Sequence, residues 1–194
     1  MRIVLHQQTL ENAGAALSIA AVALVLATAG CSDDQCGSNV PAAVYDCFTG
    51  GGMPEGAVPE GLIEVGTGRE QFEAMTPEQD LPLIVGLQGG FHFEIRTRIQ
   101  GLDGGSGTDK DGNPRTLLSA YNEAGERIDS ARATCGFFVA YEPGEDYDEL
   151  PGVRLVIFGL DSRPAVGQRV RIMAEIVDQC GRYASNDVWV VTSE

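Results

Sequence analysis

Oxygen-bearing side chains gather in one glycine-rich stretch of the chain, residues 103–113. Carboxylate and amide oxygens at alternate loop positions can converge on one Ca²⁺ ion, and Gly112 permits the sharp turn that this needs. The candidate calcium ligands are Asp103, Asp109, Asp111 and Asn113. A long hairpin loop contains the same residue types without any ion, so both interpretations stay open. The acidic residues within 142–149 allow the same two interpretations, a solvated loop or an ion site.

His92 is the one histidine beyond the first thirty residues, so any reaction that needs an imidazole would have to use it. The chain has no Gly-x-Ser-x-Gly, His-Glu-x-x-His or glycine-rich phosphate-loop pattern to accompany it. Its position in an alternating stretch of sequence predicts that it lies on the solvent face of a strand. We therefore expect no catalytic residues and a protein that is not an enzyme.

An apolar run without charged side chains spans residues 13–29, and Arg2 lies upstream of it. The run is short for a membrane span, which needs about 20 apolar residues, and small residues end it directly before Cys31. Residues 28–31 (Thr-Ala-Gly-Cys) resemble the lipobox of bacterial lipoprotein signals. An ordinary signal peptide or an uncleaved anchor is the alternative.

The lipoprotein resemblance implies removal of residues 1–30, a lipid on Cys31 and anchoring of the exported chain to a membrane of the bacterial cell envelope. Ser32, directly after the lipidated position, fits release to the outer membrane. The membrane is thus an expected partner through the lipid anchor.

The chain has five cysteines, an odd number that needs an explanation in an exported protein. A lipid on Cys31 would leave an even set for an oxidising compartment. Four cysteines allow three pairings, and the most economical one joins Cys36 to Cys47 and Cys135 to Cys180. Zinc is the competing use of these residues, but no Cys-x-x-Cys spacing occurs.

The formal net charge is −15, from 13 basic and 28 acidic residues. Removal of residues 1–30 leaves this value unchanged, because the segment contains one basic and one acidic residue. A surface with this much negative charge repels nucleic acid and anionic lipid headgroups, so nucleic acid is not an expected partner. Solubility alone would also account for the charge.

The elements that would position these residues are strands. Residues 31–60 are rich in Gly, Pro and acidic side chains and indicate a flexible tether that carries a disulfide, whereas residues 61–194 indicate one domain. Apolar and polar side chains alternate along 91–100 and 169–177, as in strands with one buried face. Other expected strands are 62–66, 82–87, 116–122, 127–133, 135–141, 153–158 and 187–192, with a short helical turn possible in 69–80. This pattern predicts an all-β sandwich.

Two resemblances accompany this pattern. Residues 167–191 resemble the last two strands of bacterial immunoglobulin-like domains, with an Asp178-x-x-Gly181 turn between them. That resemblance implies an immunoglobulin-like β-sandwich. Residues 88–92 (Gln-Gly-Gly-Phe-His) resemble a motif of uncharacterised exported bacterial proteins, and imply no activity.

Four arginines alternate outward on the two long predicted strands. If these strands lie side by side, the arginines share one face that suits an acidic partner, namely Arg96, Arg98, Arg169 and Arg171. The alternative is a structural face on which Glu94 and Glu175 form cross-strand ion pairs.

The sequence as a whole predicts a non-enzymatic envelope lipoprotein that binds another envelope protein or polymer, or serves as an accessory structural module. A domain that binds a small ligand or Ca²⁺ is the alternative function. No other cofactor is expected.

Overall fold

The computed structural model describes residues 53, 56–87, 90–107, 112–130 and 136–194. The predicted signal peptide and lipid site lie outside these ranges, and the predictions that concern them stay predictions. Other predicted residues outside the described ranges are Cys36, Cys47, Gln88, Gly89, Asp109, Asp111 and Cys135.

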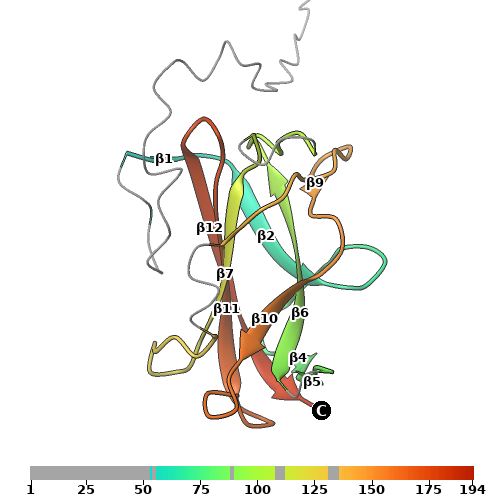
Figure 1. Cartoon of the computed structure of the whole chain (residues 1–194), viewed down its shortest axis with the longest axis vertical. Coiled ribbons are helices and arrows are strands. Elements are labelled where there is room, and N and C mark those ends of the chain that lie inside the picture. Colours follow the sequence, from blue (N-terminus) through green and yellow to red (C-terminus); the bar gives the residue numbers. More distant parts are fainter. Residues whose placement is uncertain (1–52, 54–55, 88–89, 108–111, 131–135) are drawn as a thin grey trace, which may run out of the picture.

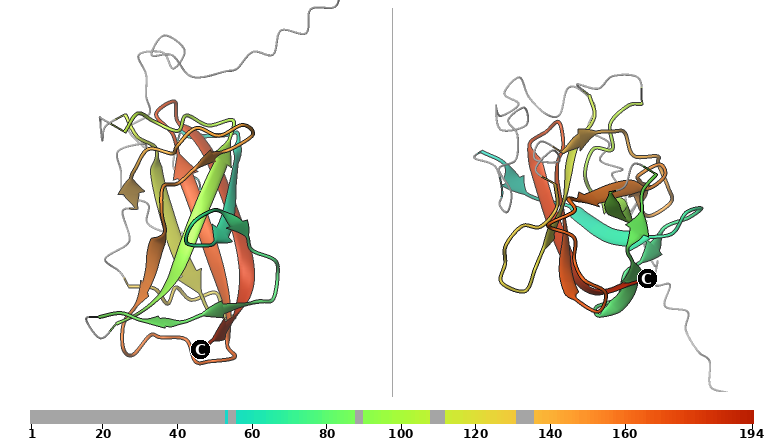
Figure 2. Two further views of the ribbon diagram at one scale, coloured as in Figure 1. Left: turned by 90° about the vertical axis from the view of Figure 1, so that its right-hand side faces the viewer. Right: turned by 60° about the horizontal axis from the view of Figure 1, so that its bottom comes forward.

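The described residues form two six-stranded sheets and no helix, so the prediction of an all-β domain is confirmed. One sheet has the order β1 (Val58–Pro59), β12 (Arg182–Ser193), β11 (Arg169–Val177), β7 (Arg115–Tyr121) and β8 (Phe137–Phe138), with β4 (Gln79–Pro82) parallel to β12. The other has the order β10 (Arg154–Phe158), β6 (Phe91–Gln100), β2 (Leu62–Thr67) and β3 (Glu73–Ala74), with β5 (Ile84–Val85) and β9 (Asp148–Glu149) beside β6. The long strands of both sheets run along the long axis of the domain (Figure 1 and Figure 2).

The core lies between the two sheets, because alternate residues of the long strands point inward. Phe93, Ile95 and Ile99 of β6 join Ile172 and Ile176 of β11 in one buried apolar cluster. The alternation read from 91–100 and 169–177 therefore identified the inward faces correctly.

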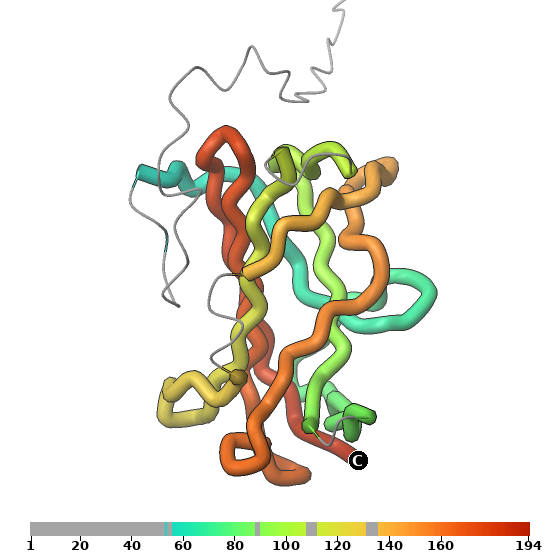
Figure 3. The backbone as a smooth tube through the Cα atoms, in the orientation of Figure 1, coloured from blue at the N-terminus to red at the C-terminus, as the bar shows by residue number. Residues whose placement is uncertain are grey.

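The predicted strand 127–133 is wrong over its described part, where only one bridge forms, between Tyr121 and Arg127. The backbone N–H of Ala120 donates to the Asp129 carboxylate at 3.0 Å instead of to a strand carbonyl. A side chain thus takes the place of the next ladder bond, and the chain leaves β7 as the loop seen in Figure 3 (yellow).

The expected helical turn is also wrong, and other short segments meet the expectation only in part. Residues 69–80 contain no helical turn; β3 and the start of β4 lie there. The expected strand 82–87 is reduced to the last residue of β4 and the two residues of β5. In 135–141, the two residues of β8 form the strand. Val58–Pro59, assigned to the tether by composition, pair with the start of β12.

Tyr141 connects the two sheets through its hydroxyl group. The Tyr141 Oη lies 2.8 Å from Thr97 Oγ1 of β6 and 3.0 Å from Thr116 Oγ1 of β7. Burial raises the pKa of Tyr141 to about 12, so the hydroxyl stays protonated as a donor. This buried triad satisfies hydroxyls that would otherwise be unpaired in the core.

Asp178 closes the β11–β12 turn from a fully buried position. Its carboxylate accepts hydrogen bonds from the backbone N–H groups of Cys180 and Arg182, each at 2.9 Å, and of Asp103 at 3.0 Å. Arg182 also forms an ion pair with it at 2.6 Å. Gly181 has φ +76°, a conformation that glycine adopts without strain, which explains the Asp-x-x-Gly pattern.

Candidate functional site

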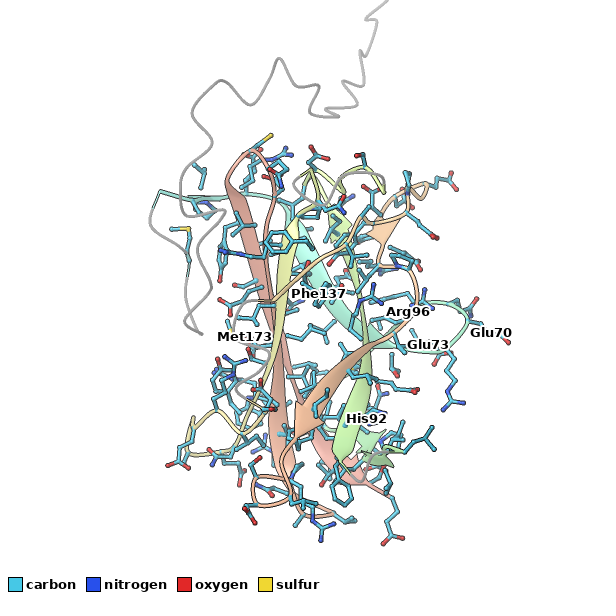
Figure 4. The ribbon with its side chains drawn as sticks, viewed as in Figure 1. Glu70, Glu73, His92, Arg96, Phe137 and Met173 are labelled. Atoms are coloured by element: carbon cyan, nitrogen blue, oxygen red, sulfur yellow. The ribbon has the colours of Figure 1, made fainter. Side chains whose placement is uncertain are left out.

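The four arginines of the predicted binding face lie in two different sheets, so the side-by-side placement of 91–100 and 169–177 is wrong. β6 pairs with β2 and β10, whereas β11 pairs with β7 and β12. Figure 4 shows Arg96 on the side of β6 and Met173 on the side of β11. The two pairs of arginines cannot form one surface, because the core separates the sheets.

Arg96 and Arg98 hold loops onto the outer face of β6. Arg96 is 6% exposed, and its guanidinium donates to the backbone oxygens of Arg69 at 3.3 Å and Leu150 at 3.5 Å. Arg98 lies 4.0 Å from the Tyr147 ring centre and 4.4 Å from that of Phe72. The ion pair of Arg98 with Glu64, at 2.7 Å, leaves little of this cation for a partner.

The outer face of β12–β11–β7 is organised around Arg171. Trp189 of β12 and Tyr121 of β7 lie directly opposite it in the two ladders, so the three side chains share one face. The Arg171 guanidinium lies 4.8 Å from the centre of the Tyr121 ring. Met173, the next residue on this face, lies opposite Asp187 and Ser119.

Arg169 and Arg171 differ in their electrostatic surroundings. Arg169 makes a bidentate contact with Glu78 (2.9 and 2.6 Å) and a third bond to Glu123 at 3.0 Å. This hydrogen bonding lowers the pKa of Glu78. Arg171 has no hydrogen bond or ion pair within the ranges that the structure describes, and its Nε atom is buried.

Glu175, expected on the wet face of β11, is instead fully buried. Its carboxylate accepts a hydrogen bond from the Tyr183 hydroxyl at 2.9 Å. Burial, followed by smaller effects of Glu175, raises the pKa of Tyr183 to about 12. Glu94 pairs with Arg69 of a loop at 3.2 Å rather than with an arginine across a strand. The expected cross-strand pairing of Glu94 is therefore wrong.

The two described members of the predicted calcium set shape their own loop. Asp103 Oδ1 accepts the N–H of Gly105 at 2.9 Å, and Asn113 Oδ1 accepts that of Ser106 at 3.1 Å. Among the described residues, no group of three or more His, Cys, Asp or Glu side chains can hold a metal ion. The sequence-based calcium site is untested, because Asp109 and Asp111 lie outside the described ranges.

The acidic segment 142–149 approaches the 103–113 loop through Asp148. Burial, and then the charge of Asp103, raise the pKa of the Asp148 carboxyl. A groove of about 510 Å³ lies beside these residues, lined mostly by apolar groups. Its lining includes Gly105, Asn113, Phe138, Tyr141 and Pro143.

His92 lies on the outer face of β6, opposite Ile84 of β5 and Ile157 of β10 (Figure 4). These apolar neighbours offer no carboxylate or nucleophile to the imidazole. Sequence reasoning placed His92 correctly on the outward side of its strand.

Comparison with protein-family models, with curated proteins and with solved structures gives no match for this chain. In the described part of the chain, no helix is long and apolar enough to cross a membrane. Trp189 and Tyr121 are not among the residues predicted from the sequence to form a binding face. Their signal was available, since Trp189 is the chain's one tryptophan and lies in a predicted strand.

Proposed function

We propose that this chain is a lipid-anchored envelope protein whose all-β domain binds another macromolecule and performs no reaction. The observation that carries the binding role is Arg171, a cation beside Trp189 and Tyr121 that lacks a carboxylate partner within the described ranges. Arginine, tryptophan and tyrosine are the residues that most often dominate binding energy at protein interfaces.

The proposed location in the cell rests on the sequence. Residues 1–30 would be removed, Cys31 would carry the lipid, and the protein would be anchored to the outer membrane. The position of β1 is compatible with a tether. Val58 pairs with Arg182 at the start of β12, whereas Ser193, near the C-terminus, lies at the other end of that strand (Figure 1). The tether would thus enter at the end of the domain where β12 begins, and Ala57 packs there against Leu117, Val177 and Tyr183. Asp187 and the half-buried Arg171, Met173 and Trp189 keep exposed surface on that sheet.

For the fold we propose the immunoglobulin-like sandwich. Its usual sheets contain strands A, B and E in one layer and C, F and G in the other. The order β2–β6–β10 corresponds to A–B–E, and β7–β11–β12 corresponds to C–F–G. The shared core between the two sheets also supports this proposal.

Site-directed photocrosslinking in the native envelope tests the binding role. A photoreactive residue would replace Asp187, which is exposed and lies on the same face as Met173 and Arg171. Leu155, an exposed residue on the outer face of the other sheet, serves as the matched control position. A discrete adduct from position 187 and none from position 155 is the expected result. No adduct from position 187 would contradict a binding role for this face.

The second candidate function is calcium binding, and the observation that favours it is the position of Asp148, whose carboxylate lies against Gly104 of the 103–113 loop and is repelled by the charge of Asp103. A cation between two carboxylates would relieve that repulsion. Millimolar calcium chloride should then raise the melting temperature, as for extracellular calcium modules. Asp103→Asn should remove the increase, and Asp146→Asn, an exposed position in the same acidic segment, should keep it. An unchanged wild-type melting temperature would eliminate this candidate.

A further inference from the structure

Arg171 stands apart from most arginines of the domain. Ion pairs with carboxylates engage six of them: Arg69, Arg96, Arg98, Arg127, Arg169 and Arg182. Arg154 donates to backbone carbonyls. Arg171 has the ring of Tyr121 as its contact, on a chain whose net charge is −15. Within the described ranges, Arg171 therefore lacks the carboxylate partner that these six arginines have, and its guanidinium can bind one from outside.

Two buried polar atoms lie on the face around Arg171. Ser119 is fully buried, and within the described ranges neither its Oγ nor the Arg171 Nε has a hydrogen-bond partner. Ser119 is a diagonal neighbour of Arg171 on the same face of the sheet. It pairs with Met173, whereas Arg171 pairs with Tyr121, two residues further along β7. Burial closes Ser119 to an external ligand, so an incoming anion would be bound by the guanidinium of Arg171, which is half-buried and lies beside the strand segment that carries the exposed Asp187.

We propose that Arg171 binds a carboxylate presented by a partner protein, and that apolar side chains around this carboxylate pack on Trp189 and Met173. This inference rests on the proposed binding function and names the partner's chemistry. The guanidinium fork matches a carboxylate with two parallel hydrogen bonds. The net charge of −15 disfavours polyanions such as nucleic acid, whereas a single carboxylate in an apolar setting adds little long-range repulsion.

Trp189 supplies the readout, because it is the chain's one tryptophan and lies opposite Arg171. The full chain, purified from membranes, is titrated with a leucine-rich peptide that contains one central glutamate, while the Trp189 fluorescence is followed. The reference peptide has glutamine in place of glutamate. We expect the acidic peptide to shift the fluorescence saturably and the neutral peptide to bind at least tenfold more weakly, as for loss of a charge-assisted bond.

Two variants locate the binding on the structure. Arg171→Gln should weaken binding of the acidic peptide at least tenfold. Arg163→Gln is the matched control, because Arg163 also lies over an aromatic ring, that of Phe91 at 4.6 Å, but outside the β12–β11–β7 sheet. Equal affinity for both peptides, equal loss in both variants, or no response of the wild type would overturn the proposal.

Other occupants of the face give different results. If inorganic phosphate competes as well as the acidic peptide, the site binds anions in general rather than a carboxylate, and the proposal is overturned. Concentration-dependent sedimentation of the wild type that Arg171→Gln abolishes would also overturn it, since a second copy would then cover the face. If the photocrosslinked adduct at position 187 persists in Arg171→Gln, the carboxylate proposal fails while the binding function stands. If no adduct forms at all, the binding function itself fails.

Discussion

Removal of the Asp178 carboxylate should destabilise the domain strongly. The side chain is fully buried and accepts bonds from three backbone N–H groups and from Arg182. Asp178→Ala would leave these donors unsatisfied and separate the β11–β12 turn from the loop that begins at Asp103. Breaking a buried ion pair by removing one partner costs about 3–5 kcal/mol, and we expect a loss of this size.

Urea unfolding, followed by circular dichroism, measures this loss. For a domain of this size the free energy of unfolding falls by about 1–3 kcal/mol per molar urea, so a loss of about 4 kcal/mol lowers the midpoint by roughly 2 M. Asp178→Asn keeps the shape and part of the acceptor capacity, and should lower the midpoint by less. Asp146→Ala, at an exposed position, should change it little. A midpoint of Asp178→Ala close to that of the wild type would refute the role assigned to this carboxylate.

Three further predictions concern other parts of the protein. Tyr141→Phe should cost about 1–3 kcal/mol because it leaves two buried threonine hydroxyls unpaired, whereas Tyr147→Phe, with a bond of 3.4 Å to a half-buried glutamate, should cost less in the same urea titration. Burial raises the pKa of Asp148 in the folded state, so the free energy of unfolding falls as pH rises through that pKa and the carboxyl ionises. Asp148→Asn should therefore stabilise the domain at about pH 7 but not at about pH 3. Cys31→Ser should move the protein out of the alkali-washed membrane fraction, and its retention there would contradict lipidation.

The inward faces of the strands could be predicted because a strand repeats every two residues. Phe93 and Ile172 are recognisable as core residues from local alternation alone, and the Asp178-x-x-Gly181 turn from four neighbouring positions. These features depend on contacts close in sequence or on a fixed period. The sequence therefore determined the all-β class, both long strands and the turn after β11.

The neighbours of each strand were decided by tertiary structure. Alternation of apolar and polar residues specifies which way a side chain points, but it does not specify which strand lies beside the strand that carries it. Arg96 and Arg171 both point outward on their strands; loops that pack across β6 bury the first, whereas the second keeps its place beside Trp189. Glu175 is buried as well, and Tyr183 of the neighbouring strand donates to its carboxylate. Burial of an outward face depends on segments distant in sequence, and only the folded chain brings them together.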